Sequence, residues 1–501
     1  MSKNLFRATL TVSTLAVITR ILSFLFRIYL SRTIGAESLG IYQIALSVFF
    51  LFATITSGLS LTVSRKTAEL NALDKTREAR SFLSASLILG ISISALIICV
   101  FYLFQNSFSF LFSDKRCLPI FLVLLPSCLS TSAYGIIRGW FWGKKNFSVF
   151  AFTEFFECII RIELGLLLIS GIIFGINGAY GTALSFTISD FLCTALFIIL
   201  FFKLGGRFGK PHGYKQIAKS AVPLSAVRVY NSLTNSFIAI IVPALLINSG
   251  LDTTSAMQNF GRAMGMAIPL LLSPNALTGS ISTVLVPVLA SLQAKGETCE
   301  LKRKINGSLT LASLCSMLFI ALFIPLGESI GMLFYNDNLA GRFVSYSASI
   351  MLPMAINGIS STVMDSLGLE VKTMRNSMIG SGFMILSLFL LTPLIQTYSI
   401  PVGLGLSYAV TGGLNCIVLK KKIGLSLKDF FKKLLVEGVT VGVCIFGATF
   451  IKNILKSMPL IFQIAIPSIF VTMLFFVINT LYGYIDVSSF YKRRKKVRAH
   501  A

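Results

Sequence analysis

Long apolar segments separated by short polar links recur along the whole chain. About fourteen of them are long enough to cross a bilayer, for which roughly 20 apolar residues suffice. They cover residues 5–30, 40–64, 82–105, 118–138, 148–174, 178–202, 221–247, 256–292, 306–326, 343–366, 376–396, 400–419, 434–456 and 460–484. This pattern predicts an all-α integral membrane protein with about fourteen transmembrane helices.

The first six segments and the next six follow a similar pattern. Residues 53–70 and 275–292 are both rich in Ser, Thr and Gly before an aliphatic stretch, and both lead into a polar link. Paired six-helix bundles around a central cavity are a transporter architecture, with the binding site where the repeats meet. We therefore expect two pseudo-symmetric six-helix lobes, 1–203 and 221–420, joined by a cytoplasmic linker, 204–220. Two additional transmembrane helices, 421–486, and a basic tail, 487–501, follow.

The basic residues alternate between the links in a way that predicts the orientation of the chain. Of the 44 Lys and Arg residues, 33 fall in the links on the N-terminal side of the membrane, 6 on the opposite side and 5 within segments. Cytoplasmic links carry the excess of Lys and Arg in membrane proteins. The pattern thus predicts a multi-pass protein of the cytoplasmic membrane with both termini in the cytoplasm.

Composition and charge exclude several classes of protein. The chain has 501 residues, 55% of them hydrophobic, and a net charge of +25. Its basic residues form short clusters between apolar segments, so no basic domain exists to bind nucleic acid. The nine cysteines are scattered without metal-ligand spacing, and no glycine-rich loop ends in Gly-Lys-Ser/Thr. We expect no metal, no cofactor and no nucleic-acid partner, and no catalytic residues are assigned.

Two arginines lie inside the first apolar segment, where charge is costly. Arg20 and Arg27 are seven residues apart, which places both on one face of a helix. An arginine in hydrocarbon costs at least about 2.5 kcal/mol and normally faces a bundle interior or a water-filled cavity. The pair predicts a cavity for an anion; the alternative is a structural role, with both paired to acidic groups or backbone carbonyls.

Two further arginines fall in the seventh and eighth segments. Arg228 and Arg262 complete a set of four expected cavity cations. Pro269 and Pro274 follow Arg262 and interrupt its helix, so we interpret them as a hinge, because proline frees backbone groups and permits bending. The alternative for Arg262 is a kinked helix with a structural arginine.

The acidic residues inside the segments suggest other roles. Glu157 and Arg161 are four residues apart, the spacing of an ion pair on one helix, and are expected to be structural. Asp190 has no acidic or basic neighbour in its own segment. It is either an ion-coupling site for a proton or cation, or the partner of an arginine from another segment. Glu328 and Asp337 are interpreted as solvated acids of an external loop.

Arginine is suited to one class of anion in particular. Its planar guanidinium donates two parallel hydrogen bonds and remains charged at all accessible pH values, which suits phosphate groups. A cationic cavity within a membrane protein fits an anionic head group attached to a lipid tail. We therefore expect the partners to be membrane lipids and a lipid-linked diphosphate substrate.

Three stretches resemble a known family. Residues 19–44, 57–70 and, most specifically, 261–296 resemble the stage V sporulation protein B branch of the multidrug/oligosaccharidyl-lipid/polysaccharide (MOP) exporter superfamily. The resemblance implies a MATE/MOP-like fold of two six-helix lobes around a V-shaped cavity. It also implies alternating access and the flipping of undecaprenyl-diphosphate-linked sugars, without enzymatic chemistry.

The resemblance extends to the MurJ-type lipid II flippases of the same superfamily. By position, Arg20 and Arg27 match the arginine pair of their first helix, with a spacing one residue longer, and Arg262 matches the arginine of their eighth helix. The resemblance implies lipid II or a similar peptidoglycan precursor as substrate, for use in the spore cortex. The partners that the resemblance implies are a lipid-linked oligosaccharide diphosphate as substrate and, as candidates, cell-wall synthases.

Four alternatives to this function stay open on the sequence. One is a flippase for another polyprenyl-linked polysaccharide unit. A second is a cation-coupled multidrug exporter, which would need acidic residues in its cavity, whereas the first segment carries two arginines and no acid. A third is a non-transporting membrane scaffold, for which the cavity arginines would be dispensable. The fourth is a membrane-embedded enzyme.

Overall fold

Helices account for nearly all of the chain that the structure describes. The structure is a computed structural model and describes residues 3–169 and 178–483; the predicted tail, 487–501, and the predicted end of the fifth segment, 170–174, lie outside the described residues. No strand occurs in the described ranges. The predicted all-α membrane class is therefore confirmed.

Ten helical stretches within the described ranges are long and apolar enough to cross a membrane. Two of them, Thr14–Ala72 with 59 residues and Glu370–Ile423 with 54 residues, are each long enough for two crossings. The number of fourteen transmembrane helices stays a prediction.

The chain forms two compact units, Met1–Gly261 and Arg262–Ala501. The predicted limits of the two lobes, the linker and the additional helices stay predictions. Unit 1 contains α1 (Lys3–Ala53), α2 (Ser57–Ala72), α3 (Thr76–Leu103), α4 (Cys117–Leu124), α5 (Ser127–Gly143), α6 (Ser148–Ile169), α7 (Gly178–Lys203), α8 (Tyr214–Asn248) and α9 (Thr253–Phe260). Unit 2 contains α10 (Ile268–Leu272), α11 (Asn275–Ala294), α12 (Thr298–Tyr335), α13 (Asn338–Ser347), α14 (Met351–Ser366), α15 (Glu370–Ile395), α16 (Ser399–Ile423), α17 (Lys428–Ile454) and α18 (Leu460–Leu481).

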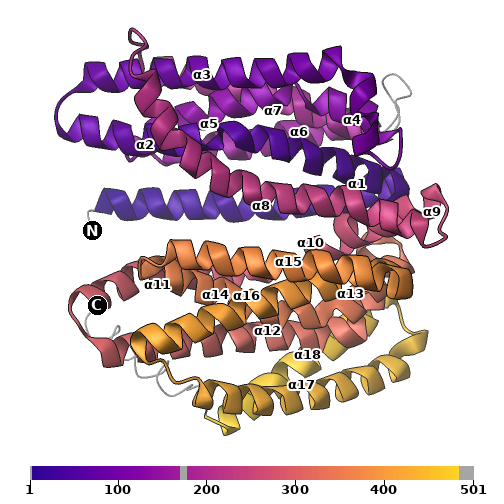
Figure 1. Ribbon diagram of the computed structural model, residues 1–501. Helices are drawn as coiled ribbons and strands as arrows, with labels where there is room; N and C mark the ends of the chain where they lie inside the picture. The colour runs from indigo at the N-terminus through magenta and orange to yellow at the C-terminus, as the bar shows by residue number, and fades with distance from the viewer. Residues whose placement is uncertain (1–2, 170–177, 484–501) are drawn as a thin grey trace. The chain divides into compact units, whose positions relative to one another are not determined.

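A single glycine divides the long helix α1 into two segments. Gly35 has φ 75° and ψ 172°, a conformation that L-amino acids with a side chain rarely adopt. The segment before it contains Arg20 and Arg27, and the segment after it continues through a 3₁₀ turn, Thr54–Thr56, into α2. The first two predicted apolar segments are thus joined without a loop (Figure 1).

Two glycines let the second segment of α1 pack backbone to backbone against α9. A Cβ on Gly40 would lie 2.3 Å from the carbonyl oxygen of Met257, and a Cβ on Gly261 would lie 1.9 Å from that of Ala36. Small residues permit such close approach in membranes, where helices associate through packing. This contact fixes α9 at the point where the chain leaves unit 1.

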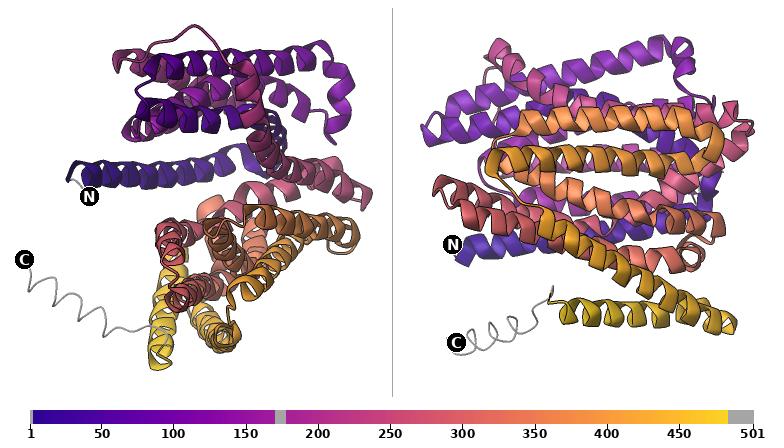
Figure 2. Two further views of the ribbon diagram at one scale, coloured as in Figure 1. Left: turned by 60° about the vertical axis from the view of Figure 1, so that its left-hand side comes forward. Right: turned by 60° about the horizontal axis from the view of Figure 1, so that its bottom comes forward.

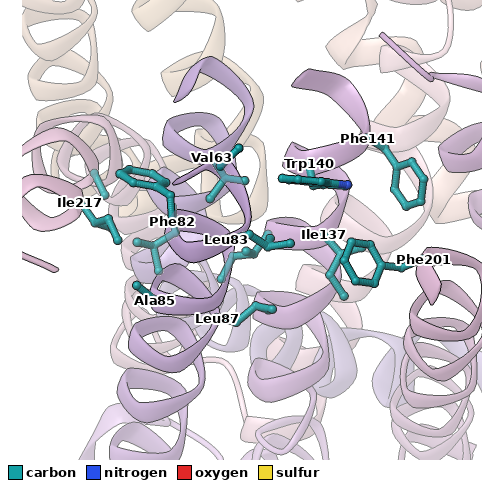
Figure 3. Packing of buried hydrophobic residues seen from close by; sticks show 14 of the residues in the cluster. Val63, Phe82, Leu83, Ala85, Leu87, Ile137, Trp140, Phe141, Phe201 and Ile217 are labelled. Atoms are coloured by element: carbon teal, nitrogen blue, oxygen red, sulfur yellow. The ribbon is translucent and has the colours of Figure 1, made fainter. Parts of the chain in front are cut away.

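An apolar core stabilises one end of unit 1. Buried side chains of α2, α3, α5, α7 and α8 meet there, as Figure 3 shows for Val63, Leu83, Ile137, Phe201 and Ile217. Trp140 of α5 is 2% exposed in this cluster, and its ring centroid lies 6.2 Å from that of Phe201. The core therefore holds α5 in a fixed rotation about its own axis.

A cluster of ion pairs holds the link between α3 and α4 against α1. Arg116 contacts Asp114 at 2.7 Å and Glu37 of α1 at 2.7 Å. Burial raises the pKa of Asp114, but the hydrogen bonds from Arg116 outweigh burial, and the net pKa is below its ordinary value. The link is thereby fastened to the segment of α1 that follows Gly35.

Unit 2 is built around the 38-residue helix α12. Apolar side chains of α11, α12, α14 and α16 form its core, and the orange helices α14, α15 and α16 lie side by side in Figure 2. Helix α12 ends at Tyr335, and the next residue, Asn336, has the left-handed conformation. Asp337 then caps α13 by accepting a hydrogen bond from the Ala340 amide at 2.9 Å. The α12–α13 connection is therefore tight.

Gly331→Ala is expected to destabilise unit 2, because its Cβ would lie 2.3 Å from the Cα of Gly341 on α13. The contact joins the backbones of two helices, which have little room to move apart, so the free energy of unfolding is expected to fall by about 1–3 kcal/mol. Thermal unfolding in detergent measures it as a lower Tm. Gly382→Ala on α15 is the matched control, because a Cβ there meets nothing within 4 Å. An unchanged Tm for Gly331→Ala would contradict the close packing.

Candidate functional site

The arginine pair of the first segment lies on α1, before Gly35. Arg20 is exposed and Arg27 is half-buried. The Cys158 sulfur of α6 lies 3.4 Å from the Ser23 hydroxyl, and this contact holds α1 against α6. Glu154 of α6 is close enough to Arg20 for their charges to interact. The guanidinium of Arg20 is thus accessible on unit 1, with one carboxylate nearby.

A polar network occupies the interior of unit 1, between α6 and α7. Arg161 forms an ion pair with Glu157, one helical turn away on α6. Its Nε also donates to the Ser189 hydroxyl at 3.4 Å, and its Cζ lies 4.6 Å from the centre of the Phe186 ring. These contacts hold the guanidinium from both helices, which is the arrangement expected of a structural residue.

Asp190 lies in the same part of unit 1 and is 8% exposed. Its carboxylate accepts hydrogen bonds from Ser130 and, at 3.1 Å, from Thr131, both on α5. Arg161 is close enough to interact with it through charge, and so is Glu157. Asp190 is therefore surrounded by two hydroxyl groups at hydrogen-bond distance, and it shares the nearby cation Arg161 with Glu157. Its carboxylate on α7 and the two hydroxyls on α5 form a set of oxygen ligands.

Arg228 lies exposed on α8 of unit 1. The helix is fixed to its neighbours at two points. The Gly58 amide of α2 donates to the Ser225 hydroxyl at 3.1 Å, and the Ser236 hydroxyl donates to the Ser47 carbonyl at 2.6 Å. These bonds set the rotation of α8 and so the side on which Arg228 projects.

Arg262 begins unit 2 within a seven-residue π-helix, Gly261–Ala267. Its Nε donates to Asp337 at 2.8 Å, and the two side chains are only 20% and 16% exposed. The Tyr335 hydroxyl donates to the Met266 carbonyl at 3.0 Å, which ties the π-helix to the end of α12. π-Helical turns often occur at functional sites. Asp337, expected to be a solvated loop acid, is instead the partner of a predicted cavity arginine.

The two predicted hinge prolines bound the short helix α10. Pro269 occupies its first turn, and Pro274 precedes α11. The predicted eighth segment, 256–292, is therefore divided into four pieces: the end of α9, the π-helix, α10 and α11. Within the described ranges no group of three or more His, Cys, Asp or Glu residues could hold a metal ion.

The structure brings some of the predicted cations into one neighbourhood. Within unit 1, Arg20 interacts with Glu154, and Glu154 in turn interacts with Arg138 of α5. Arg138 also interacts with Arg228. Arg27 shares a different neighbour, Tyr42, with Arg161, whereas Arg262 belongs to unit 2.

Arg138 and Glu154 are site residues that the sequence did not reveal. Arg138 falls five residues before the end of α5, at the last position of the predicted segment 118–138, where it counts among the basic residues of the following link. The signal was present as Tyr134, Arg138 and Trp142, spaced by four, which places an aromatic–cation–aromatic row on one helical face.

Comparison with known proteins agrees with this architecture. Residues 5–293 match the family described as polysaccharide biosynthesis protein. Stage V sporulation protein B of Bacillus subtilis (strain 168) is 25% identical over 396 residues, which is 76% of either chain. Sporulation protein YkvU of the same organism is 21% identical over 301 residues, 58% of this chain and 66% of that protein.

Two solved structures are similar in fold. One is the lipid II flippase MurJ in its inward closed conformation. The superposition covers 94% of this chain and 98% of the MurJ chain, with a TM-score of 0.70 and 18% sequence identity. An inward-facing MATE family transporter of the MOP superfamily covers 83% and 98%, with a TM-score of 0.67 and 14% identity. The predicted MATE/MOP-like fold is thereby confirmed. Because the family model matches more than half of the residues of this multi-pass membrane protein, the chain belongs to the polysaccharide biosynthesis protein family.

Proposed function

We propose that this protein is a flippase that moves an undecaprenyl-diphosphate-linked cell-wall precursor across the cytoplasmic membrane by alternating access. The substrate is lipid II or a similar peptidoglycan intermediate. The observation that carries the proposal is the exposure of Arg20 and Arg228 on membrane helices of unit 1. Exposed guanidinium groups at such positions need an anion to offset their charge, and a diphosphate suits their paired donors.

The orientation follows from the distribution of charge. With 33 basic residues in the links on the N-terminal side and 6 on the other, both termini lie in the cytoplasm. The precursor then enters from the cytoplasmic leaflet, where such lipids carry their head groups before translocation.

An apolar cavity in unit 2 suits the hydrocarbon part of such a substrate. Its volume is about 800 Å³, and α14, α16 and the start of α17 line it with side chains such as Ile356, Ile417 and Phe431. None of the predicted arginines lines this cavity.

Asp190 is the proposed site of energy coupling. Its carboxylate and the Ser130 and Thr131 hydroxyls supply oxygen ligands of the kind that bind a proton or a hard cation. The membrane potential supplies roughly 2.3 kcal/mol per charge for each 100 mV. Coupling at Asp190 therefore allows an ion gradient to drive the return of the empty carrier.

Translocation of fluorescent lipid II in proteoliposomes tests this function. Wild-type protein is expected to expose the label to an external quencher, and protein-free liposomes are not. Asp190→Asn is expected to remove the dependence of the rate on an imposed ion gradient. If a different undecaprenyl-diphosphate-linked glycan is translocated and lipid II is not, the substrate is that other polysaccharide unit and not lipid II. No movement of any lipid-linked glycan would contradict the proposal.

Use of the precursor in the spore cortex is a finer proposal. It is supported by the similarity to stage V sporulation protein B of Bacillus subtilis. Cell-wall synthases, which consume the flipped precursor, are the proposed protein partners. Accumulation of the precursor in the cytoplasmic leaflet after deletion, with a thin cortex, is the expected phenotype.

A further inference from the structure

One face of α5 carries a cation held between aromatic rings. The Cζ of Arg138 lies 4.9 Å from the centre of the Trp142 ring on its own helix and 5.3 Å from that of Phe150 on α6. Both distances are within the range of a cation–π contact. The Arg138 side chain is partly exposed, so the rings orient the guanidinium without covering it.

Two N–H groups in this arrangement have no acceptor. The Arg138 Nε and the Trp142 indole Nε1 are both buried, and neither has a hydrogen-bond partner among the residues that the structure describes. Nearly all buried donors in proteins are satisfied, so two adjacent exceptions on one helical face require an explanation. The Tyr134 hydroxyl, one turn before Arg138, contacts Thr153 at 3.1 Å and accepts from neither of these two N–H groups.

The charges around this face favour an anion. Arg228 of α8 is close enough to Arg138 to interact with it electrostatically, and so is Glu154 of α6. Glu154 also interacts with Arg20 of α1 and with Glu157, and Glu157 is itself paired with Arg161. Glu154 is thus a single exposed carboxylate near Arg20, Arg138 and Arg228, and the net charge on this face of unit 1 is positive.

We propose that Arg138 and Trp142 form an oxyanion site that binds a phosphate of the diphosphate in the lipid-linked substrate, with Glu154 as the counter-ion that the phosphate outcompetes. This rests on the function proposed above. The guanidinium Nε–H and the indole N–H donate to phosphate oxygens, and Arg228 adds charge. Arginine rather than lysine suits such a site, because its fork donates in a fixed plane.

The position of the site along α5 supports a phosphate ligand. Arg138 lies five residues before Gly143, the end of the helix, which corresponds to roughly 7–8 Å along the axis. That depth is close to the interface where lipid head groups lie. The basic residues Lys144 and Lys145 follow immediately, on the side assigned to the cytoplasm. The site is therefore placed to receive the head group as it enters.

The two tryptophans of the chain allow a direct measurement of binding. Trp142 belongs to the site, and Trp140 is packed in the apolar core, 2% exposed. With 5-fluorotryptophan incorporated into protein in phosphatidylcholine nanodiscs, two ¹⁹F resonances are expected, and Trp142→Phe assigns them. Undecaprenyl diphosphate is expected to shift the Trp142 resonance saturably and to leave the Trp140 resonance in place.

Three variants test the assignment of the donors. Arg138→Gln is expected to raise the Kd for undecaprenyl diphosphate about tenfold or more. Arg138→Lys, which keeps the charge and loses the fork, is expected to recover only part of this loss. Glu154→Gln is expected to lower the Kd about threefold, because a competing charge is removed. Unchanged Trp140 resonances in these variants check that the core is intact.

Several outcomes would overturn the inference. Equal Kd values for wild type and Arg138→Gln would do so, and so would equal shifts of both tryptophan resonances. Saturation of the Trp142 shift by phosphatidylglycerol, not reversed by undecaprenyl diphosphate, would assign the site to a bilayer phospholipid instead. Inorganic phosphate as the only ligand would likewise exclude the lipid-linked diphosphate. If wild type binds undecaprenyl diphosphate as expected and yet moves no lipid II, the flippase function fails while this site stands.

Discussion

Arg262→Ala and Arg20→Ala are each expected to abolish translocation of lipid II, by about a hundredfold or more, with the protein still present in the membrane. Charge-assisted hydrogen bonds to a buried anion are among the strongest that side chains make, and loss of one or two of them accounts for this factor. The fluorescent lipid II assay measures the rate, and an immunoblot of the membrane fraction measures the amount of protein.

The ion pair of Arg262 with Asp337 makes a sharper experiment possible. Asp337 both binds Arg262 at 2.8 Å and caps α13 through the Ala340 amide. Asparagine caps helices as well as aspartate does, so Asp337→Asn removes the charge and keeps the cap. If Arg262 binds the substrate, Asp337→Asn is expected to retain translocation with a lower KM, because the arginine no longer shares its charge with a carboxylate.

A purely structural role for Arg262 predicts a different result. In that case, Arg262→Ala and Asp337→Asn break the same ion pair and should reduce activity and Tm to similar extents. Equal losses in the two variants would therefore contradict the assignment of Arg262 to substrate. Arg303→Gln on α12 serves as the control and should retain full activity, because this exposed arginine forms its ion pair with Glu300, one turn away on its own helix.

Arg161→Ala is expected to reduce the amount of protein in the membrane severely. Glu157 is 17% exposed and Arg161 30% exposed, and the breaking of a buried ion pair from one side typically costs about 3–5 kcal/mol. The remaining access to solvent places this pair at the lower end of that range. Asp190 would also lose its nearby cation. A loss of that size is a large part of the stability of a typical domain.

The double variant Glu157→Gln/Arg161→Gln separates charge from packing. It removes both charges and keeps side chains of similar length, so protein levels are expected to recover most of the way. The comparison is made by immunoblot and by thermal unfolding in detergent. Low levels in the double variant, equal to those of Arg161→Ala, would show that the ring contact with Phe186 or the bond to Ser189 matters more than the ion pair.

The class of fold could be predicted because the bilayer restricts what a chain can do. Apolar segments of more than 20 residues must be helices there, since all their backbone groups need partners within the segment. The details of the connections could not be predicted in the same way. The turn at Gly35 uses one residue, because the polar residues 31–39 around it are helical, and the π-helix at Gly261–Ala267 has no distinct hydrophobic period.

The local pairs of charges could be expected from spacing, whereas the distant ones could not. Glu157 and Arg161 are four residues apart and lie side by side in any helix. Arg262 and Asp337 are 75 residues apart and meet through the packing of the π-helix against the end of α12. The acids of the α12–α13 link resemble solvated loop residues, and only the three-dimensional structure distinguishes Asp337, which pairs with Arg262, from Glu328, which pairs with exposed Arg342.

The glycine turn in α1 limits how this protein can be engineered. Proteases and inserted tags need an exposed, extended stretch of chain, and the connection at Gly35 offers a single residue between two helical segments. An epitope or a reporter domain placed here would push apart the segment that carries Arg20 and the segment that packs on α9. Labels for following the motion of the first two crossings therefore belong at other connections, such as residues 204–213 between α7 and α8.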